Sequence, residues 1–129
     1  MIHFDFFKAY DSMELNVLIK ILDIYGFGSE ILKMIEVMYK FSNGFININN
    51  KKYNQPINIT KGVRQGDVIS PLLYLYFINP LITELEQSEL GYQLSSKLSI
   101  PVVAYCDDIV IVSDSLVKIH KLARIVKRF

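Results

Sequence analysis

The chain has 129 residues, of which 51% are hydrophobic and 21% charged, and its formal net charge is +1. This composition argues against intrinsic disorder, which requires low hydrophobicity and high net charge. The single cysteine, Cys106, excludes an internal disulfide and a zinc site built on several thiolates. We therefore predict one folded domain over residues 1–129.

Nothing in the sequence indicates export or a membrane. The N-terminus lacks a basic region followed by an apolar run, so we predict no secretory signal. The longest uncharged stretch, residues 68–83, is shorter than the ~20 residues of a membrane helix. We expect an intracellular protein, in the nucleus or cytoplasm, with no membrane partner.

The first half of the chain predicts a strand, two helices and a hairpin. Residues 3–7 are apolar and aromatic and predict a strand that contains Asp5. Asp11 and Glu14 have capping-box spacing, which predicts a helix that ends near Gly26. A second helix follows, with Ser29 as its cap and one apolar face made by Ile31, Met34, Ile35 and Met38. Residues 44–48 and 53–59 predict two strands, joined by a turn over 49–52.

The second half predicts a helix, a hairpin and a last helix. After a loop at 61–67, Ser70 and Pro71 are typical of a helix start. That helix should run toward Glu86 and be kinked or interrupted near Pro80. Strands at 100–105 and 109–112 should form a tight hairpin, followed by a helix capped by Asp114 or Ser115. This order predicts an α+β fold with two layers, an antiparallel sheet with helices packed on one face.

The hairpin tip carries the most informative residues, within the segment AYCDDIVIV at 104–112. An unpaired carboxylate in a buried strand costs several kcal/mol, whereas at a hairpin tip the cost falls. There Asp107 and Asp108 can converge on a cation, and hard ions such as Mg²⁺ prefer carboxylate oxygens. The alternative is that both aspartates serve only as turn formers.

A second acidic position lies in the segment HFDFFKAYD at 3–11. If its strand lies beside the hairpin, Asp5 joins Asp107 and Asp108 at one edge of a sheet. Three like charges at one place require a metal ion for neutralisation. Asp11 is better explained as a helix cap than as a ligand.

The loop KGVRQGDVISPLLY at 61–74 is the third feature. Gly62 and Gly66 allow the backbone to approach a ligand closely. Arg64 and Gln65 offer donors to phosphate, sugar or base. The alternative is an ordinary connection between a hairpin and a helix.

In this order, the three segments resemble the palm motifs of reverse transcriptases. FDFFKAYD resembles the first motif, GVRQGDVISPLLY the second and AYCDD the third. The residues of the second motif are similar to those of non-LTR (LINE-type) retrotransposons. The resemblance implies a partial, palm-like reverse transcriptase domain over residues 1–129, with fingers and thumb incomplete. The missing fingers and thumb segments would then belong to a parent polyprotein.

The resemblance also implies roles for individual residues. Asp5, Asp107 and Asp108 match the catalytic carboxylates that bind two Mg²⁺ ions, with Mn²⁺ as an alternative and Asp108 in a less direct role. The backbone carbonyl of Phe6 would join the metal ligands. Cys106 occupies a variable position, where a small buried residue is expected. The residues matching the nucleotide and template site are Tyr10, Arg64, Gln65 and Gly66.

The activity implied for the complete enzyme is RNA-directed DNA synthesis. A primer 3′-hydroxyl would attack a dNTP, with an RNA template and a DNA primer as partners. One alternative is a catalytically inactive remnant of a retrotransposon polymerase, with no enzymatic role in isolation. Another is an RNA-templated RNA polymerase, against which the second motif and Tyr10 argue.

Overall fold

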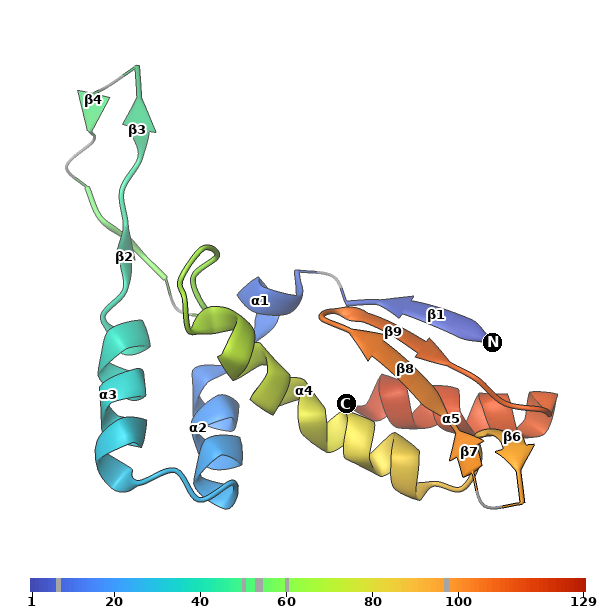
Figure 1. The fold of residues 1–129 in the computed structure, drawn as a ribbon. Helices are drawn as coiled ribbons and strands as arrows, with labels where there is room; N and C mark the ends of the chain where they lie inside the picture. Colours follow the sequence, from blue (N-terminus) through green and yellow to red (C-terminus); the bar gives the residue numbers. More distant parts are fainter. Residues whose placement is uncertain (7, 50, 53–54, 60, 97) are drawn as a thin grey trace. The chain divides into compact units, whose positions relative to one another are not determined.

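The computed structural model describes residues 1–129 except 7, 50, 53–54, 60 and 97 (Figure 1). The chain divides into two compact units. The first unit combines the two ends of the chain, Met1–Ala9 and Tyr74–Phe129. The second unit is the continuous segment Tyr10–Leu73.

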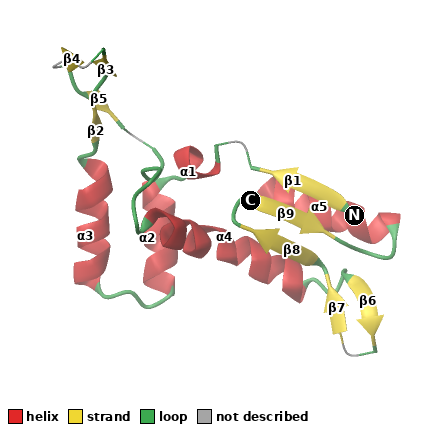
Figure 2. Ribbon diagram, turned by 45° about the horizontal axis from the view of Figure 1, so that its top comes forward, coloured by secondary structure: helices red, strands yellow, loops and turns green. Residues whose placement is uncertain are grey.

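The first unit is built on a three-stranded antiparallel sheet in the order β1-β9-β8 (Figure 2). Its strands are β1 (Ile2–Asp5), β8 (Val102–Tyr105) and β9 (Asp108–Ile111). Side chains alternate between the two faces of a strand. Ile109 and Ile111 are fully buried on one face, so Asp108 and Val110 belong to the other. The predicted hairpin is confirmed, although Asp108 already lies in the strand.

Two helices supply the rest of the buried core of this unit. They are α4 (Ser70–Gln87), which belongs to the first unit from Tyr74 onward, and α5 (Leu116–Arg128). Helix α5 contacts β9. The buried helix residues recur at spacings of three and four, as in an amphipathic helix, and are Ile78, Leu81, Leu85, Ile119, Leu122 and Val126. Helices therefore pack on the face of the sheet that carries Ile109 and Ile111.

Helix α4 begins where the sequence predicts but does not stop at its proline. The helix starts at Ser70 and continues through Pro80 to Gln87, so it is not interrupted there, and a kink, the other predicted outcome, stays a prediction. An interior proline costs about 3 kcal/mol. The buried side chains Ile78 and Leu81 flank Pro80, and their burial offsets this local cost.

A second hairpin in the first unit has no counterpart among the predicted elements. It consists of β6 (Tyr92–Ser95) and β7 (Leu98–Ile100). The sequence of β6, YQLS, alternates apolar and polar residues over only four positions, and every residue of the strand is exposed. Helix α5 follows later, with Ser115 at its N-cap position but no side-chain cap bond. Asp114, the other predicted cap, instead pairs with Lys118 at 3.0 Å.

The second unit contains α1 (Ala9–Ser12, of which Ala9 falls in the first unit), α2 (Leu15–Ile24) and α3 (Ser29–Lys40). Helix α2 ends at Ile24, which confirms the predicted end near Gly26, and Gly26 has a φ of +83°. The N–H of Phe27 bonds to the carbonyl of Leu22 at 3.1 Å, which closes a Schellman motif. Helices α2 and α3 contact each other.

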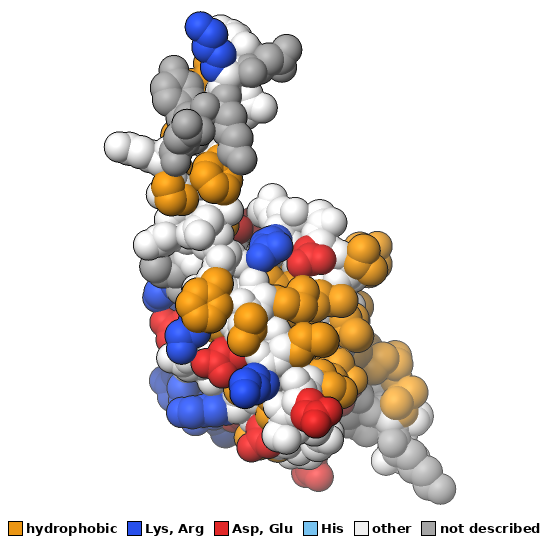
Figure 3. Space-filling model, turned by 90° about the vertical axis from the view of Figure 1, so that its left-hand side faces the viewer, with side chains coloured by type: hydrophobic (Ala, Val, Ile, Leu, Met, Phe, Trp, Pro, Cys, Tyr) orange, Lys and Arg blue, Asp and Glu red, His pale blue; other side chains and the backbone are white. Residues whose placement is uncertain are grey.

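The buried face of α3 is rotated by part of a turn from the apolar face that the sequence predicts. Ile35 and Tyr39 are buried, whereas Ile31 and Met34 are about half exposed. Figure 3 views the molecule from the side of α3 and shows apolar side chains exposed to solvent there. The cap prediction is also wrong, because Gly28 holds the N-cap position and Ser29 is the first helical residue.

The predicted capping box at the start of α2 does not form. Asp11 lies inside α1, and Glu14 is the N-cap residue without a side-chain cap bond. The carboxylate of Glu14 instead pairs with Lys61 at 2.9 Å. The backbone here is fixed from elsewhere in the chain, because Gly62 N–H bonds to the Met13 carbonyl at 2.8 Å.

The predicted hairpin in the second unit is present as two short ladders. Strand β2 (Asn43–Gly44) pairs with β5 (Ile57–Asn58), and β3 (Asn47–Ile48) pairs with β4 (Lys51–Lys52). Lys51 and Lys52, which were predicted to lie in the turn, belong to β4. The turn is therefore shorter than predicted. Residues 53–54 of the predicted second strand lie outside the described residues. In the described part of the chain, no helix combines the length and apolarity needed to cross a membrane.

Candidate active site

Two of the predicted acidic residues face each other at one end of the three-stranded sheet. Asp5 is the last residue of β1 and is the register partner of Asp108, the first residue of β9. Tyr105 of β8 is the register partner of Asp108 on its other side. Opposite residues of an antiparallel pair have Cβ atoms about 4.5–5.5 Å apart. The Asp5 strand therefore lies beside the aspartate hairpin, which was the condition for these carboxylates to come together.

These carboxylates lie at the surface. Asp5 and Asp108 are exposed and Asp107 is half-buried. Asp5 lies at the end of β1. Like charges directly opposite each other destabilise a pair of strands. None of the ion pairs found among the described residues involves Asp5, Asp107 or Asp108.

This donor set suits a hard divalent cation in its chemistry. Two facing carboxylates without a basic partner among the described residues provide the oxygen ligands and negative charge that Mg²⁺ prefers. Within the described residues, however, no group of three His, Cys, Asp or Glu side chains could hold a metal ion. The predicted meeting of three carboxylates is therefore not found there. Asp107 lies in the turn rather than in a strand, so strand alternation does not align it with the other two.

The turn that carries Asp107 has an unusual backbone. Cys106 and Asp107 link β8 to β9, and Cys106 has a φ of +53°. A positive φ at the first central residue of a two-residue turn occurs in type II′ turns, where glycine is preferred. Cys106 is exposed, so the predicted buried role is wrong. A central turn residue has no neighbouring strand to cover it.

Arg64 lies in the second unit, where its guanidinium is bonded to the C-terminal end of α3. Its Nη2 donates to the Met38 carbonyl and to Ser42 Oγ, both at 2.8 Å. Its Nε also donates to Ser42 Oγ, at 3.1 Å. The guanidinium carbon lies 5.9 Å from the centroid of the Tyr39 ring. Several of its donors are thus engaged within the protein, and the predicted contact with nucleotide or template stays a prediction.

Tyr39 is a buried member of the cluster around Arg64, and its role was not predicted from the sequence. Its hydroxyl donates to Asp67 Oδ2 at 3.3 Å and lies 3.2 Å from Ser70 Oγ. Burial raises the pKa of the Tyr39 hydroxyl above its ordinary value, the Asp67 carboxylate raises it further, and Ser70 and Arg64 act in the opposite direction. The spacing of Tyr39 four residues after Ile35 was the available signal, because it places a hydroxyl on the buried face of α3.

The two glycines of the loop differ in their surroundings. A Cβ on Gly62 would lie 2.6 Å from the Asp11 Cα and 2.7 Å from the Tyr10 carbonyl oxygen. The close approach predicted for a ligand is therefore made at Gly62 by the protein's own backbone. Gly66 has a φ of +87° and open space around it.

The remaining predicted residues are divided between the units. Gln65 is exposed and Tyr10 is half-buried in α1, both in the second unit with Arg64 and Gly66. Phe6 lies in the first unit with the aspartates, and its carbonyl accepts the N–H of Ala9 at 3.2 Å. Phe6 directly follows Asp5 in the chain, and the predicted role of its carbonyl as a metal ligand stays a prediction.

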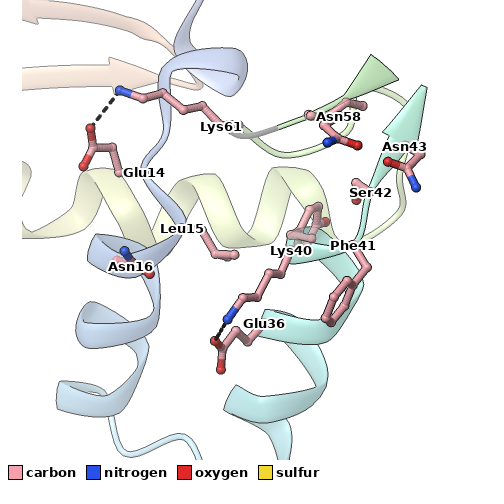
Figure 4. Close-up of a pocket in the computed structure, with 13 residues that line it drawn as sticks. Glu14, Leu15, Asn16, Glu36, Lys40, Phe41, Ser42, Asn43, Asn58 and Lys61 are labelled. Atoms are coloured by element: carbon pink, nitrogen blue, oxygen red, sulfur yellow. Dashed lines mark hydrogen bonds and ion pairs between the residues drawn. The ribbon is translucent and has the colours of Figure 1, made fainter. Parts of the chain in front are cut away.

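The second unit also contains a cavity of about 570 Å³ (Figure 4). Two ion pairs lie along it, Glu14 with Lys61 at 2.9 Å and Glu36 with Lys40 at 3.4 Å. Gly62, predicted to approach a ligand, lines this cavity, whereas none of the predicted catalytic, metal or nucleotide-binding residues does. Because its charged groups neutralise each other, we assign it no ligand.

Together, the fold and the site define an α+β protein with paired carboxylates at one end of a small antiparallel sheet. The family model described as "Reverse transcriptase (RNA-dependent DNA polymerase)" matches residues 1–129. The chain therefore belongs to the reverse transcriptase family, and the predicted resemblance is confirmed.

Curated relatives come from transposable elements. The chain is 30% identical over 115 residues to the transposon TX1 uncharacterized 149 kDa protein of Xenopus laevis. It is 24% identical over 115 residues to a retrovirus-related Pol polyprotein from the type-1 retrotransposable element R2 of Popillia japonica. Both matches cover 88% of this chain, but only 9% and 19% of the relatives. The chain thus spans a tenth to a fifth of their length.

Proposed function

We propose that this chain is the palm of an RNA-directed DNA polymerase, and that Asp5, Asp107 and Asp108 are its catalytic carboxylates. The observation that carries the proposal is the register pairing of Asp5 with Asp108, in a chain of the reverse transcriptase family. The substrates would be a dNTP, a DNA primer and an RNA template, acted on by the complete protein.

The carboxylates of Asp5, Asp107 and Asp108, with the carbonyl of Phe6, would hold divalent cations, of which Mg²⁺ fits oxygen donors best. When bound, such ions activate a primer 3′-hydroxyl and stabilise the leaving pyrophosphate. The protein contributes fixed negative oxygens on a paired strand end, which a strand ladder positions more precisely than a loop would.

The sheet face that carries Asp5 and Asp108 is open enough to receive a substrate. By strand alternation, His3 and Val103 share this face with the aspartates. The side chains of Val103 and Tyr105 are 56% and 79% exposed. We assign this face to the primer end and the incoming nucleotide. Tyr10, Arg64, Gln65 and Gly66 are assigned to nucleotide and template on their match to the family motifs.

The test is primer extension by a longer protein that contains this segment, on an RNA template with Mg²⁺ and dNTPs. We expect Asp107→Asn and Asp108→Asn to lower the extension rate by roughly 10²–10³-fold, as expected when a group that stabilises transition-state charge is lost. Asp23→Asn is the control, because Asp23 is exposed and belongs to none of the ion pairs found. Undiminished extension by the Asp107 variant would contradict the assignment.

Metal binding can be measured on the 129-residue chain itself. We expect Mn²⁺ to broaden the NMR amide signals around Asp5 and Asp108 first, and Asp108→Asn to weaken this broadening. Broadening that is strongest elsewhere in the chain would contradict the site.

A catalytically inactive remnant is the second candidate. The observation that favours it is the absence of a three-ligand metal group among the described residues. The extension assay separates the two candidates, because a remnant yields no product with or without the substitutions.

A further inference from the structure

Helix α5 carries an unusual concentration of positive charge. Its 13 residues, LVKIHKLARIVKR, include five of the 14 basic residues of the chain and no acidic residue. Because the whole chain has a net charge of only +1, the remaining residues carry an acidic excess. The charge of α5 is thus a local feature that the composition conceals.

Four of these five charged residues, all but Lys118, lie with His120 on one side of the helix. At 100° per residue, five positions fall within about a third of its circumference. We call them the α5 basic stripe: His120, Lys121, Arg124, Lys127 and Arg128, all of which are exposed. The buried side chains of α5 lie on the opposite side, at Ile119, Leu122 and Val126. The stripe therefore faces solvent.

Most of the stripe has no acidic partner within the described residues. Arg128 pairs with Glu84, and Lys118, outside the stripe, pairs with Asp114. None of the ion pairs or hydrogen bonds found there involves the side chains of Lys121, Arg124 or Lys127. A charge run is often only a solvated face, but such faces commonly alternate acidic and basic residues. Three neighbouring unpaired cations are better suited to a polyanion.

The spacing of these cations matches a phosphodiester backbone. Lys121, Arg124 and Lys127 are three residues apart, so together they extend over about 9 Å of helix. A nucleic acid strand in a duplex presents one phosphate per ~3.4 Å of axis. Three long, flexible cationic side chains can therefore each meet a phosphate.

The stripe is separate from the proposed catalytic face. Helix α5 contacts β9, and Ile109 and Ile111 are buried on the helix-covered face, whereas Asp108 belongs to the opposite face. The stripe in turn points away from the sheet. Phosphates bound along α5 are consequently not the phosphates at the aspartates.

We propose that the α5 basic stripe binds the phosphate backbone of a nucleic acid, at a second site on the side of this unit opposite the carboxylates. The proposal rests on the proposed function only for the choice of nucleic acid as the polyanion. Contacts to phosphate carry no sequence information, so this site holds a strand without selecting its sequence. Its effect would be to keep template or product near the polymerase between catalytic events.

The test is fluorescence anisotropy of the 129-residue chain with 20-nucleotide RNA, the matching RNA duplex and the matching DNA duplex, at 50–200 mM salt with EDTA. The main variant replaces three stripe residues, as Lys121→Gln, Arg124→Gln and Lys127→Gln. The control variant removes three exposed lysines elsewhere, as Lys20→Gln, Lys33→Gln and Lys51→Gln. A charge-conserving variant carries Lys121→Arg, Arg124→Lys and Lys127→Arg.

We expect the stripe variant to bind single-stranded RNA at least tenfold more weakly at 50 mM salt. Its plot of log affinity against log salt should be flatter by about 2, because each phosphate neutralised on a single strand contributes ~0.7 to the slope. The control and charge-conserving variants should keep the wild-type slope. The three nucleic acids distinguish a preference for RNA from binding to any phosphate backbone.

Equal affinity and slope in the wild type and the stripe variant would overturn the proposal. So would binding to anionic lipid vesicles without binding to any of the three nucleic acids. The binding measurement is made in EDTA and does not depend on a metal ion at the carboxylates. Its outcome is therefore distinguishable from that of the extension assay, which requires Mg²⁺.

Discussion

Gly62 shows how one residue couples two distant stretches of the second unit. Its backbone lies against Tyr10 and Asp11, and it has a φ of +83°. The sequence marks this glycine as a point of close approach, which is correct. It could not show what approaches, because the neighbouring backbone comes from about fifty residues earlier in the chain.

We predict that Gly62→Ala lowers the free energy of unfolding by about 2–4 kcal/mol, because a positive φ and a backbone overlap combine. Gly66→Ala is the matched control. It has a similar φ but open space, so we expect a loss of about 1–2 kcal/mol. Urea unfolding measures both, and equal losses would show that the close approach to Asp11 is unimportant.

Tyr39 gives a prediction about pH. The raised pKa means that the folded state retains the hydroxyl proton at pH values where the unfolded chain loses it. Its contribution to stability is therefore complete below about pH 10, the ordinary tyrosine pKa, and decreases as the pH rises above it. We expect the wild type to lose stability relative to Tyr39→Phe as the pH rises above about 10. At pH 7 the variant should be about 1 kcal/mol less stable, since it lacks the bonds to Asp67 and Ser70. Parallel curves for the two proteins across the alkaline range would contradict the prediction.

At the scale of elements, strand β9 is the centre of the first unit. It is paired on both sides, and Ile109 and Ile111 on its helix-covered face are fully buried. We predict that Ile111→Ala costs about 2–5 kcal/mol through reduced burial and a cavity. Val103→Ala, on the open face of β8, should cost less than about 1 kcal/mol because the side chain is 56% exposed. Chemical denaturation compares them, and similar losses would mean that the sheet buries both faces.

The elements that the sequence predicted well are those whose signals are local. The Gly26 helix end, the aspartate hairpin and the start of α4 depend on residues adjacent in the chain. The capping box and the interruption at Pro80 failed because contacts from outside the element decided the outcome. Lys61 engages Glu14, and buried side chains hold α4 together across its proline.

The candidate site was predicted in a similarly uneven way. The motif residues led to the sheet end at which Asp5 and Asp108 pair. Tyr39 and the bonds of Arg64 were missed, because neither a buried hydroxyl nor a guanidinium reveals its partner in sequence. The α5 basic stripe was missed because the net charge of the whole chain conceals it.

At the scale of the whole molecule, the two units differ in how far apart in the sequence their contacting elements lie. The first unit needs β1 to pair with β9, across more than a hundred residues, whereas α2 and α3 of the second unit are neighbours in sequence. Closing long loops slows folding. We predict that pulsed hydrogen exchange during refolding protects the amides of α2 and α3 before those of β1. Simultaneous protection of both sets would contradict this order.

The discontinuity of the first unit has a practical consequence. A break in the chain between β3 and β4 would leave Asp5 on one fragment and Asp107 and Asp108 on the other. Neither fragment alone would contain the end of the sheet at which Asp5 and Asp108 pair, and only reassociation of β1 with β9 would restore it. The chain can thus be divided into a complementing pair of fragments, and the return of the β1–β9 pairing would report that they have associated.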